Sequence, residues 1–286
     1  MNINPSIKES ISFSIVLDSF YVYTGDKTDR YVQRSCIESG IWDKELTEWM
    51  IANIKPGWVC LDIGANIFYF TELMSRLTGK EGKVLAFEPI KRLCKVYKTA
   101  QSLNNYENCS DIEVFPFALS DKEEDLILNI WEENIGGSGI VSEHRIGNHG
   151  QYGNFYTEPI KSNRLDSVYN ERIDFIKIDV EGHELAVLQG AEKTIASSQP
   201  NFLIEVEERH REGAIESIKQ FFYVRDYKGF FMCDNKLLPL ERFNIVEHQN
   251  PKNVEIYKKV PGAIYINDLI FIPTDKIAKI FSKYLS

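Results

Sequence analysis

Short, continuous runs of apolar residues alternate with amphipathic stretches along most of the chain. The runs lie at residues 58–63, 84–87, 112–118, 175–180 and 202–206. Such runs are typical of strands buried on both faces of a parallel sheet. Between them, apolar residues recur at helical spacing over residues 43–54, 67–77, 93–103, 185–195 and 214–221. This alternation predicts an α/β fold with a mostly parallel sheet and helices on both faces.

The pattern changes in three parts of the chain. Residues 1–42 mix polar and aromatic residues, and we expect an N-terminal extension or cap there. Residues 43–286 then form the main domain. Within it, an insertion or a hairpin over the sheet is expected at about 121–166. Two late apolar segments, at 230–233 and 269–272, are expected to close the sheet as edge strands.

The composition narrows the classes of partner. The net charge is −9 and the isoelectric point is about 5.2. An acidic surface repels the phosphate backbone, so we expect no nucleic-acid partner. The chain lacks the run of about eighteen apolar residues that a membrane span requires. The five cysteines are irregularly spaced and predict neither a disulfide framework nor a zinc site. The N-terminus does not have the pattern of a signal peptide. We therefore expect a cytoplasmic protein, whose oligomeric state the sequence leaves open.

Polar residues stand at the ends of the first two apolar runs. Asp62 and Gly64 close the first run, and Glu88 closes the second, 26 positions after Asp62. In an open α/β sheet, ligands bind at the carboxyl ends of the strands. The loop has one glycine instead of the G-x-G-x-x-G of a dinucleotide site, and the helix near Asn66 offers free N–H groups. Asp62 would repel a pyrophosphate but can hold an ammonium group, and Glu88 can accept both hydroxyls of a ribose. The pattern favours an adenosine-containing cofactor with an amino-acid tail. The alternative is that Asp62 and Glu88 only cap helices.

Longer motifs resemble those of a known family. They are Leu61-Asp62-Ile63-Gly64-Ala65-Asn66, Phe87-Glu88-Pro89, Ala118-Leu119-Ser120-Asp121, and the run DFIKIDVEGHE from Asp174 to Glu184. In this order, over roughly residues 40–210, the chain resembles the FkbM family of S-adenosylmethionine-dependent methyltransferases. The resemblance implies a class I methyltransferase, Rossmann-like fold with a seven-stranded sheet whose last strand is antiparallel.

The resemblance also implies which residues bind the cofactor, S-adenosylmethionine. They are Asp62, Gly64, Ala65 and Asn66 at the methionine end, Glu88 at the ribose, and Ala118, Ser120 and Asp121 beside the adenine. One position departs from the family pattern. Glycine is usual where this chain has Phe68, and a phenylalanine there narrows the start of the following helix.

Three candidate catalytic residues follow the fourth apolar run: Asp179, Glu181 and His183. A hydroxyl nucleophile loses its proton as the methyl group arrives, and a histidine or a carboxylate can accept it. Alternatively, Asp179 and Glu205 hold a divalent metal such as Mg²⁺, which lowers the pKa of the hydroxyl. Structural interpretations also exist, with Asp179 and Glu181 at a helix start and His183 facing solvent. Glu184 is expected at the surface.

The expected activity is O-methylation of a small-molecule or glycan acceptor, at a hydroxyl of a sugar, a polysaccharide or a secondary metabolite. Catalysis would rest mainly on alignment, because a cationic sulfonium needs little activation. An alternative from another class is a non-catalytic binding or scaffold protein that kept the fold, and Phe68 is the feature that favours it. A third interpretation, an NAD-dependent oxidoreductase, is disfavoured by the missing glycine motif.

Overall fold

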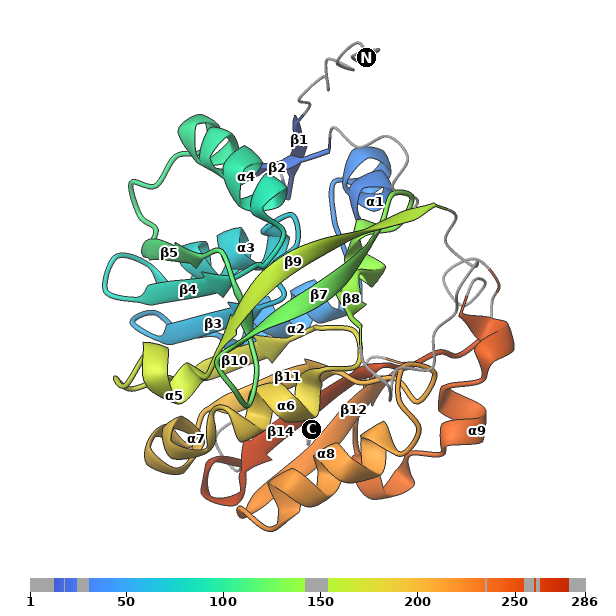
Figure 1. Ribbon diagram of the computed structural model, residues 1–286. Helices are drawn as coiled ribbons and strands as arrows, with labels where there is room; N and C mark the ends of the chain where they lie inside the picture. Colours follow the sequence, from blue (N-terminus) through green and yellow to red (C-terminus); the bar gives the residue numbers. More distant parts are fainter. Residues whose placement is uncertain are drawn as a thin grey trace.

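The apolar runs of the sequence form the centre of an eight-stranded sheet (Figure 1). The computed structural model describes residues 13–17, 19–24, 31–141, 154–234, 236–254, 260 and 263–277. In spatial order the strands are β13 (Lys236–Pro239), β12 (Tyr227–Cys233), β14 (Asp268–Pro273), β11 (Asn201–Glu205), β10 (Phe175–Ile178), β3 (Val59–Ile63), β4 (Lys83–Phe87) and β5 (Asp111–Phe115). Strands β5, β4, β3, β10 and β11 are parallel, and β14 is antiparallel to both of its neighbours. The carboxyl ends of the parallel strands therefore meet at one edge.

Alternate residues of the central strands enter two separate hydrophobic clusters, one on each face of the sheet. Cys60 and Val84 pack in one cluster with apolar side chains of α2 (Lys44–Asn53), α3 (Tyr69–Thr78) and α4 (Lys91–Leu103). Leu61 and Leu85 pack in the other with those of α6 (Glu184–Gln189), α7 (Glu192–Ser198) and α8 (Ala214–Tyr223). Because successive strand residues point to opposite faces, a continuous apolar run buries both of them. The predicted mostly parallel sheet with helices on both faces is confirmed.

Several details of the predicted sheet are wrong. Within the described residues, the central sheet has eight strands instead of seven, because β13 returns antiparallel along β12 and becomes the edge. Strand β14 is not an edge strand, since it lies between β11 and β12. The run at 112–118 does not form one strand. Strand β5 ends before Pro116, which has no N–H to donate to a neighbouring strand.

The segment after β5 builds a second, four-stranded sheet. Its order is β6 (Ala118–Leu119), β9 (Phe155–Asn163), β7 (Glu124–Trp131) and β8 (Gly139–Ile140), and β7 pairs antiparallel with β9. Figure 1 shows β7 and β9 crossing in front of the central sheet. Leu128, Ile130 and Ile160 are buried in the first of the two hydrophobic clusters. Residues 142–153 of the predicted insertion lie outside the described residues.

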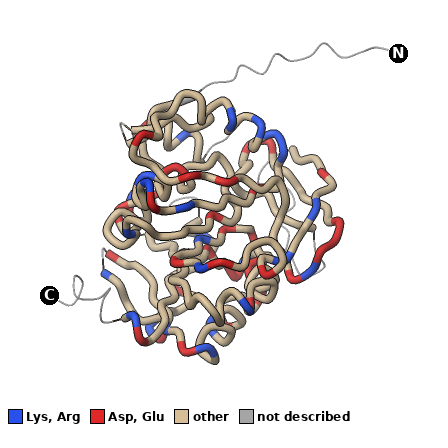
Figure 2. Tube along the Cα trace, turned by 90° about the vertical axis from the view of Figure 1, so that its left-hand side faces the viewer, with Lys and Arg blue, Asp and Glu red and all other residues tan. Residues whose placement is uncertain are grey.

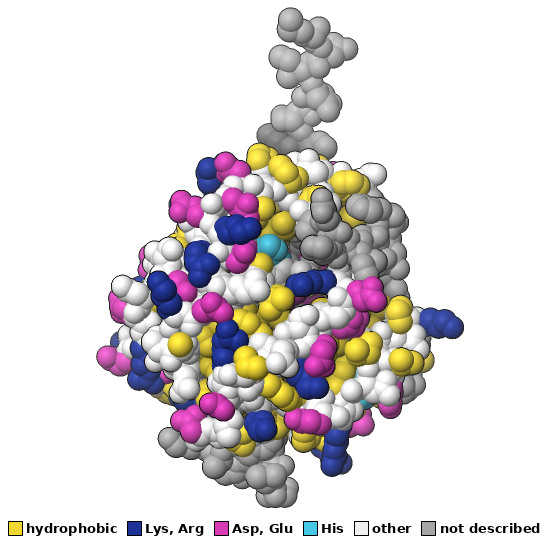
Figure 3. Space-filling view, turned by 60° about the horizontal axis from the view of Figure 1, so that its bottom comes forward, with side chains coloured by type: hydrophobic (Ala, Val, Ile, Leu, Met, Phe, Trp, Pro, Cys, Tyr) yellow, Lys and Arg dark blue, Asp and Glu magenta, His cyan; other side chains and the backbone are white. Residues whose placement is uncertain are grey.

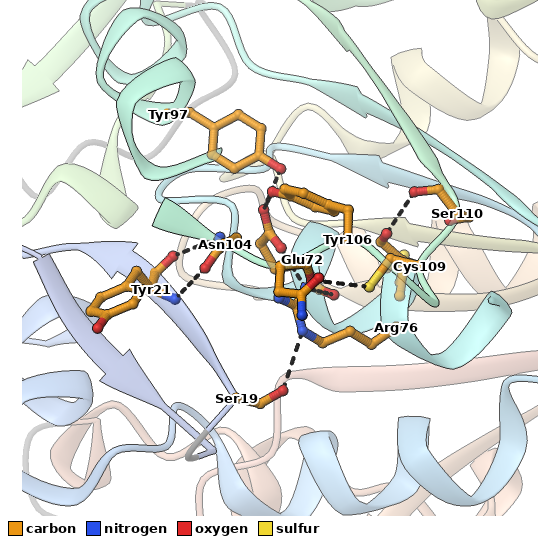
Figure 4. Close-up of polar contacts among 12 residues, drawn as sticks. Ser19, Tyr21, Glu72, Arg76, Tyr97, Asn104, Tyr106, Cys109 and Ser110 are labelled. Carbon is orange, nitrogen blue, oxygen red and sulfur yellow. Dashed lines mark hydrogen bonds and ion pairs between the residues drawn. The ribbon is translucent and has the colours of Figure 1, made fainter. Parts of the chain in front are cut away.

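The N-terminal hairpin of β1 (Phe13–Val16) and β2 (Phe20–Tyr23) is tied to α3 and α4 by polar contacts (Figure 4). The N–H of Tyr21 donates to Oδ1 of Asn104 over 2.7 Å. Beside it, the fully buried Glu72 lies 2.5 Å from Nη1 of Arg76 and accepts hydrogen bonds from the hydroxyls of Tyr97 and Tyr106. A buried carboxylate requires such partners, so this cluster, which we call the Glu72 network, anchors α3 to α4.

The remaining helical segments are short. They are α1 (Val32–Ser39), α5 (Leu165–Val168), α9 (Ile245–His248) and the 3₁₀ turns η1 (Ile135–Gly137), η2 (Leu240–Arg242), η3 (Pro251–Asn253) and η4 (Thr274–Lys276). Among the described residues, no helix combines the length and the apolar character that crossing a bilayer requires. In Figures 2 and 3, Lys and Arg are interspersed with Asp and Glu and do not form a single basic face in those views.

Candidate active site

The turn from β3 into α3 brings three strand ends together. The N–H groups of Gly64 and Ala65 donate to the carbonyl oxygen of Phe87, at 2.9 and 3.1 Å. Gly64 has a φ of +81°, and a Cβ built on it would lie 1.9 Å from the carbonyl oxygen of Asp179. Only glycine fits so close to the end of β10. The backbone therefore fixes the ends of β3, β4 and β10 against one another.

Glu88, directly after β4, holds this turn with its side chain. Its Oε2 accepts from the N–H of Asn66 over 2.7 Å, and its Oε1 accepts from the N–H of Ile90 over 2.8 Å. The residue is 4% exposed. Burial raises the pKa of Glu88 to about 7, against the lowering effect of the two N–H donors. Each carboxylate oxygen has a further lone pair, so the helix-capping role does not prevent Glu88 from binding a ligand.

A cavity lies over these strand ends, and we call it the first cavity. Its walls come from the Gly64 turn, from Glu88 to Ile90, from Ala118 and Leu119, and from the segment 135–140 that leads into β8. Asp179, Val180 and His183, which follow β10, complete the wall. Glu88, predicted to bind the ribose, and Ala118, predicted to lie beside the adenine, therefore line the same cavity. Ser120 and Asp121 are not part of its wall and lie behind it. Ser120 is 1% exposed, and its Oγ lies 2.9 Å from Nε2 of His183.

A second cavity adjoins the first. Both are lined by Gly64, Asn66, Gly136 and Asp179. Beyond this junction the second cavity is lined by the carboxylates of Glu181, Glu205 and Glu207, and by aromatic side chains that include Trp42 and Tyr265. The two cavities therefore meet at a junction that includes Asp179.

One buried cation balances part of this acidity. Lys177, on β10, is 4% exposed, and its Nζ lies 3.3 Å from Oδ2 of Asp179 and 3.6 Å from Oδ1 of Asp62. Burial alone would lower the pKa of Lys177, but the two carboxylates raise it above its usual range. Burial in turn raises the pKa of Asp179, against the opposing effect of Lys177. Lys177 thus stays charged and fixes the carboxylate at the junction of the cavities.

Asp62 lies beneath the Gly64 turn. It is fully buried, and its Oδ2 accepts a hydrogen bond from Oγ1 of Thr71 over 2.6 Å. Among the described residues, it is not part of the wall of either cavity. Its contacts with Thr71 and Lys177 support the site from below, whereas Gly64, Ala65 and Asn66 face the second cavity.

Glu181 is held in an unusual backbone conformation. Its φ is +56°, which costs a residue with a Cβ about 1–2 kcal/mol. Its Oε2 lies 3.0 Å from Nε2 of His210, and both side chains are about nine-tenths buried. The contact with His210 fixes the carboxylate of Glu181 at the wall of the second cavity.

Glu184 was expected at the surface, but it is buried, and its Oε1 accepts a hydrogen bond from the N–H of Gly182 over 2.7 Å.

Two further acids of the second cavity, Glu205 and Glu207, have pKa values that shift in opposite directions. Nδ2 of Asn267 donates to Oε1 of Glu205 over 2.6 Å, and burial raises the pKa of Glu205 well above its usual range. Burial acts in the same direction on Glu207, but the guanidinium of Arg209 lowers the pKa of Glu207 to about 2. The carboxylate oxygens of Asp179, Glu181 and Glu205 come within 4.8 Å of one another.

Phe68 does not enter either cavity. It adopts a φ of +65° at the start of α3, is 1% exposed, and stacks on Tyr97 with ring centroids 4.0 Å apart and an interplanar angle of 7°. Phe68 therefore strains the backbone by about 1–2 kcal/mol, but it is not part of the wall of either cavity. The stacked ring packs in the hydrophobic cluster on the α3 side of the sheet.

Comparisons with known proteins bear on the class of protein. A family model described as the methyltransferase FkbM domain matches residues 62–231. The chain belongs to this family. The methyltransferase sdnD of Sordaria araneosa is 28% identical over 180 residues, which cover 54% of this chain and 68% of that protein. The AMB antimetabolite synthetase AmbE of Pseudomonas aeruginosa is 28% identical over 193 residues, which cover 56% of this chain and 9% of that protein.

Among solved structures, an FkbM methyltransferase of Methylobacillus flagellatus superposes with a TM-score of 0.46 and 16% identity. The match covers 75% of this chain and 43% of that one. The FkbM match to residues 62–231 includes the Gly64 turn, Glu88 and the whole segment from Asp179 to His210. Residues before 62 and after 231, which supply part of the second cavity, lie outside it. The family therefore identifies a methyltransferase, and the acceptor must be argued from the second cavity.

Proposed function

We propose that the protein transfers a methyl group from S-adenosylmethionine to a hydroxyl oxygen of a sugar, a polysaccharide or a secondary metabolite. The observation that carries the proposal is the buried carboxylate of Glu88 in a cavity that opens at Asp179 onto a second, acidic cavity. A carboxylate is the side chain best suited to accept hydrogen bonds from both hydroxyls of a ribose.

The residues present fit this cofactor. Oδ1 of Asn66 is buried and has no hydrogen-bond partner within the described part of the chain, and Asn66 lines both cavities. A buried acceptor without a partner is costly, and the ammonium group of an amino-acid tail would satisfy it. Glu88 would then hold the ribose, Ala118 would line the adenine side with Ser120 and Asp121 behind it, and Gly64 and Ala65 would face the methionine end.

When bound, S-adenosylmethionine supplies a methyl group on a cationic sulfur, whose transfer to an acceptor oxygen leaves a neutral thioether and releases the hydroxyl proton. Glu181 accepts this proton, because it lines the second cavity and His210 fixes its carboxylate. Asp179 orients the acceptor at the junction of the cavities. Most of the acceleration comes from holding the acceptor oxygen in line at short distance.

The second cavity suits a neutral acceptor that is rich in hydroxyl groups. Its carboxylates accept hydrogen bonds from hydroxyls, and its aromatic walls can pack on the apolar face of a sugar or polyketide ring. The same carboxylates repel phosphate groups, so nucleotides and nucleic acids are disfavoured. The ammonium of Lys177 already supplies a positive charge to Asp179. We therefore propose that methyl transfer does not require the divalent metal considered for Asp179 and Glu205.

The test is equilibrium binding followed by a search for the acceptor. Wild-type protein should bind S-adenosylmethionine and its demethylated product in the micromolar range, and NAD should not compete. Release of S-adenosylhomocysteine is then measured over a panel of monosaccharides, oligosaccharides and hydroxylated natural products, with Mg²⁺ and with EDTA. Glu181→Gln should lower turnover of the acceptor and leave cofactor affinity within about twofold. A folded protein that binds no cofactor would contradict the proposal, and turnover that EDTA abolishes would contradict its metal-free form.

A further inference from the structure

Two polar side chains of the loop after β10 line different cavities. Glu181 lines the second cavity, whereas His183 lines the first, together with Ala118 and Leu119. Among the described residues, His183 is not part of the wall of the second cavity. The sequence suggested His183 as a base, but a base must reach the acceptor hydroxyl, which the second cavity would hold.

The hydrogen bonds of Ser120 determine which nitrogen of His183 carries the proton. The Ser120 hydroxyl lies 3.2 Å from Oδ1 of Asp121 and 2.9 Å from Nε2 of His183. A carboxylate only accepts, so the single hydroxyl hydrogen points to Asp121 and the oxygen accepts from Nε2–H of His183. Burial lowers the pKa of His183, so the imidazole is neutral at physiological pH. Nδ1 is then an acceptor, and it has no hydrogen-bond partner among the described residues.

The backbone around Ser120 is fixed from several sides. A Cβ built on Gly190 would lie 1.9 Å from the carbonyl oxygen of Ser120, so the end of α6 packs directly on this loop. The N–H of Ser120 donates to the carbonyl oxygen of Asn163 over 2.9 Å, and Nη1 of Arg164 donates to that of Asp121 over 2.6 Å. The position of the imidazole is therefore set before any ligand binds, which favours selectivity.

We propose that His183 is a specificity-determining residue, which selects adenine by accepting a hydrogen bond from its exocyclic amino group. The inference rests on the proposed use of an adenosine cofactor and names a recognition element within that site. A purine with a carbonyl oxygen at the same position offers an acceptor where His183 also presents one, so it is disfavoured.

The experiment compares two ligands that differ at this one group, S-adenosylhomocysteine and S-inosylhomocysteine, by calorimetry at pH 7.5. The proteins are wild type, His183→Phe, Ser120→Ala and, as a control on the exposed side of the same helix, Gln189→Ala. Wild type and the control should prefer the adenine ligand by roughly twentyfold or more. His183→Phe keeps a flat ring without an acceptor, and should weaken only the adenine ligand, by about five- to tenfold. Ser120→Ala removes the hydroxyl that keeps the proton of His183 on Nε2, and should reduce the preference for the adenine ligand about two- to fivefold.

The nitrogen resonances of His183 give a second readout that a purely structural role would not change. Nδ1 should resonate as an unprotonated nitrogen in the free protein, and should shift when the adenine ligand binds but not when the inosine ligand binds. If wild type prefers adenine and both His183→Phe and Ser120→Ala keep the full preference, the inference is overturned while the cofactor proposal stands. If folded wild type binds neither ligand, the cofactor proposal itself fails. Should His183→Phe not fold, the preference of Ser120→Ala and the resonances decide alone.

Discussion

Affinity for S-adenosylhomocysteine should rise about tenfold between pH 6 and pH 8, because Glu88 must be ionised to bind the ribose. Burial raises the pKa of Glu88 to about 7. The ionised fraction is then about one tenth at pH 6 and about nine tenths at pH 8. Ribose hydroxyls donate hydrogen bonds, and both oxygens of the ionised carboxylate can accept them. Binding therefore favours the charged form and releases a proton, and affinity increases with pH.

Calorimetry at pH 6, 7 and 8 measures this dependence, and repeating it in buffers of different ionisation enthalpy counts the released protons. Glu88→Gln is the matched control, since it keeps the size of the side chain but cannot ionise. It should bind more weakly and without a pH slope over this range. The lowered pKa of His183 keeps that residue neutral over most of the range. A flat wild-type affinity, or a slope that survives in Glu88→Gln, would refute the role of Glu88.

Substitutions at three further positions test the contacts that support the site. Gly64→Ala places a Cβ 1.9 Å from the carbonyl oxygen of Asp179. The free energy of unfolding should therefore fall by at least about 2 kcal/mol, and the affinity for the cofactor by at least about a hundredfold. Unchanged affinity would show that the turn is not part of the site. Phe68→Ala and Phe68→Gly both lose the ring stacked on Tyr97, but in urea titrations the glycine variant should be about 1 kcal/mol the more stable, because only glycine adopts this φ freely. Cofactor affinity should stay within about threefold of wild type in both variants. A larger loss would show that Phe68 affects the cofactor site. Glu72→Gln removes the buried carboxylate that pairs with the partly buried guanidinium of Arg76, and should cost about 3 kcal/mol in the same titrations. Glu216→Gln, at an exposed ion pair, should cost less than about 1 kcal/mol.

The sequence predicted where the strands end, and hence that Gly64, Glu88 and Asp179 lie at one edge of the sheet. This worked because continuous apolar runs give strands directly, and parallel strands share the edge at which they end. It did not predict that Asp62 lies beneath the turn. Alternation along β3 places Asp62 on the face of Cys60, toward α3, and this signal was available in the sequence.

Other features could not be derived from local pattern. Lys177 inside an apolar strand indicates a buried charge that needs a partner, but the partner depends on the register that sets Lys177 opposite Asp62. His210 contacts Glu181 across a separation of 29 positions, through a turn without regular structure. The helix expected at 185–195 divides into α6 and α7, and at the junction Gly190 packs against the backbone of Ser120, a tertiary contact that no helical periodicity reports.

The crystal structure of the complex with S-adenosylhomocysteine tests the central claim most directly, because the claim assigns each part of the ligand to a named wall. We predict both ribose hydroxyls within hydrogen-bond distance of Glu88, the adenine beside Ala118 and His183, and the sulfur directed at Asp179 and the second cavity. A ligand that binds elsewhere, or one whose adenine occupies the acidic second cavity, would contradict the account.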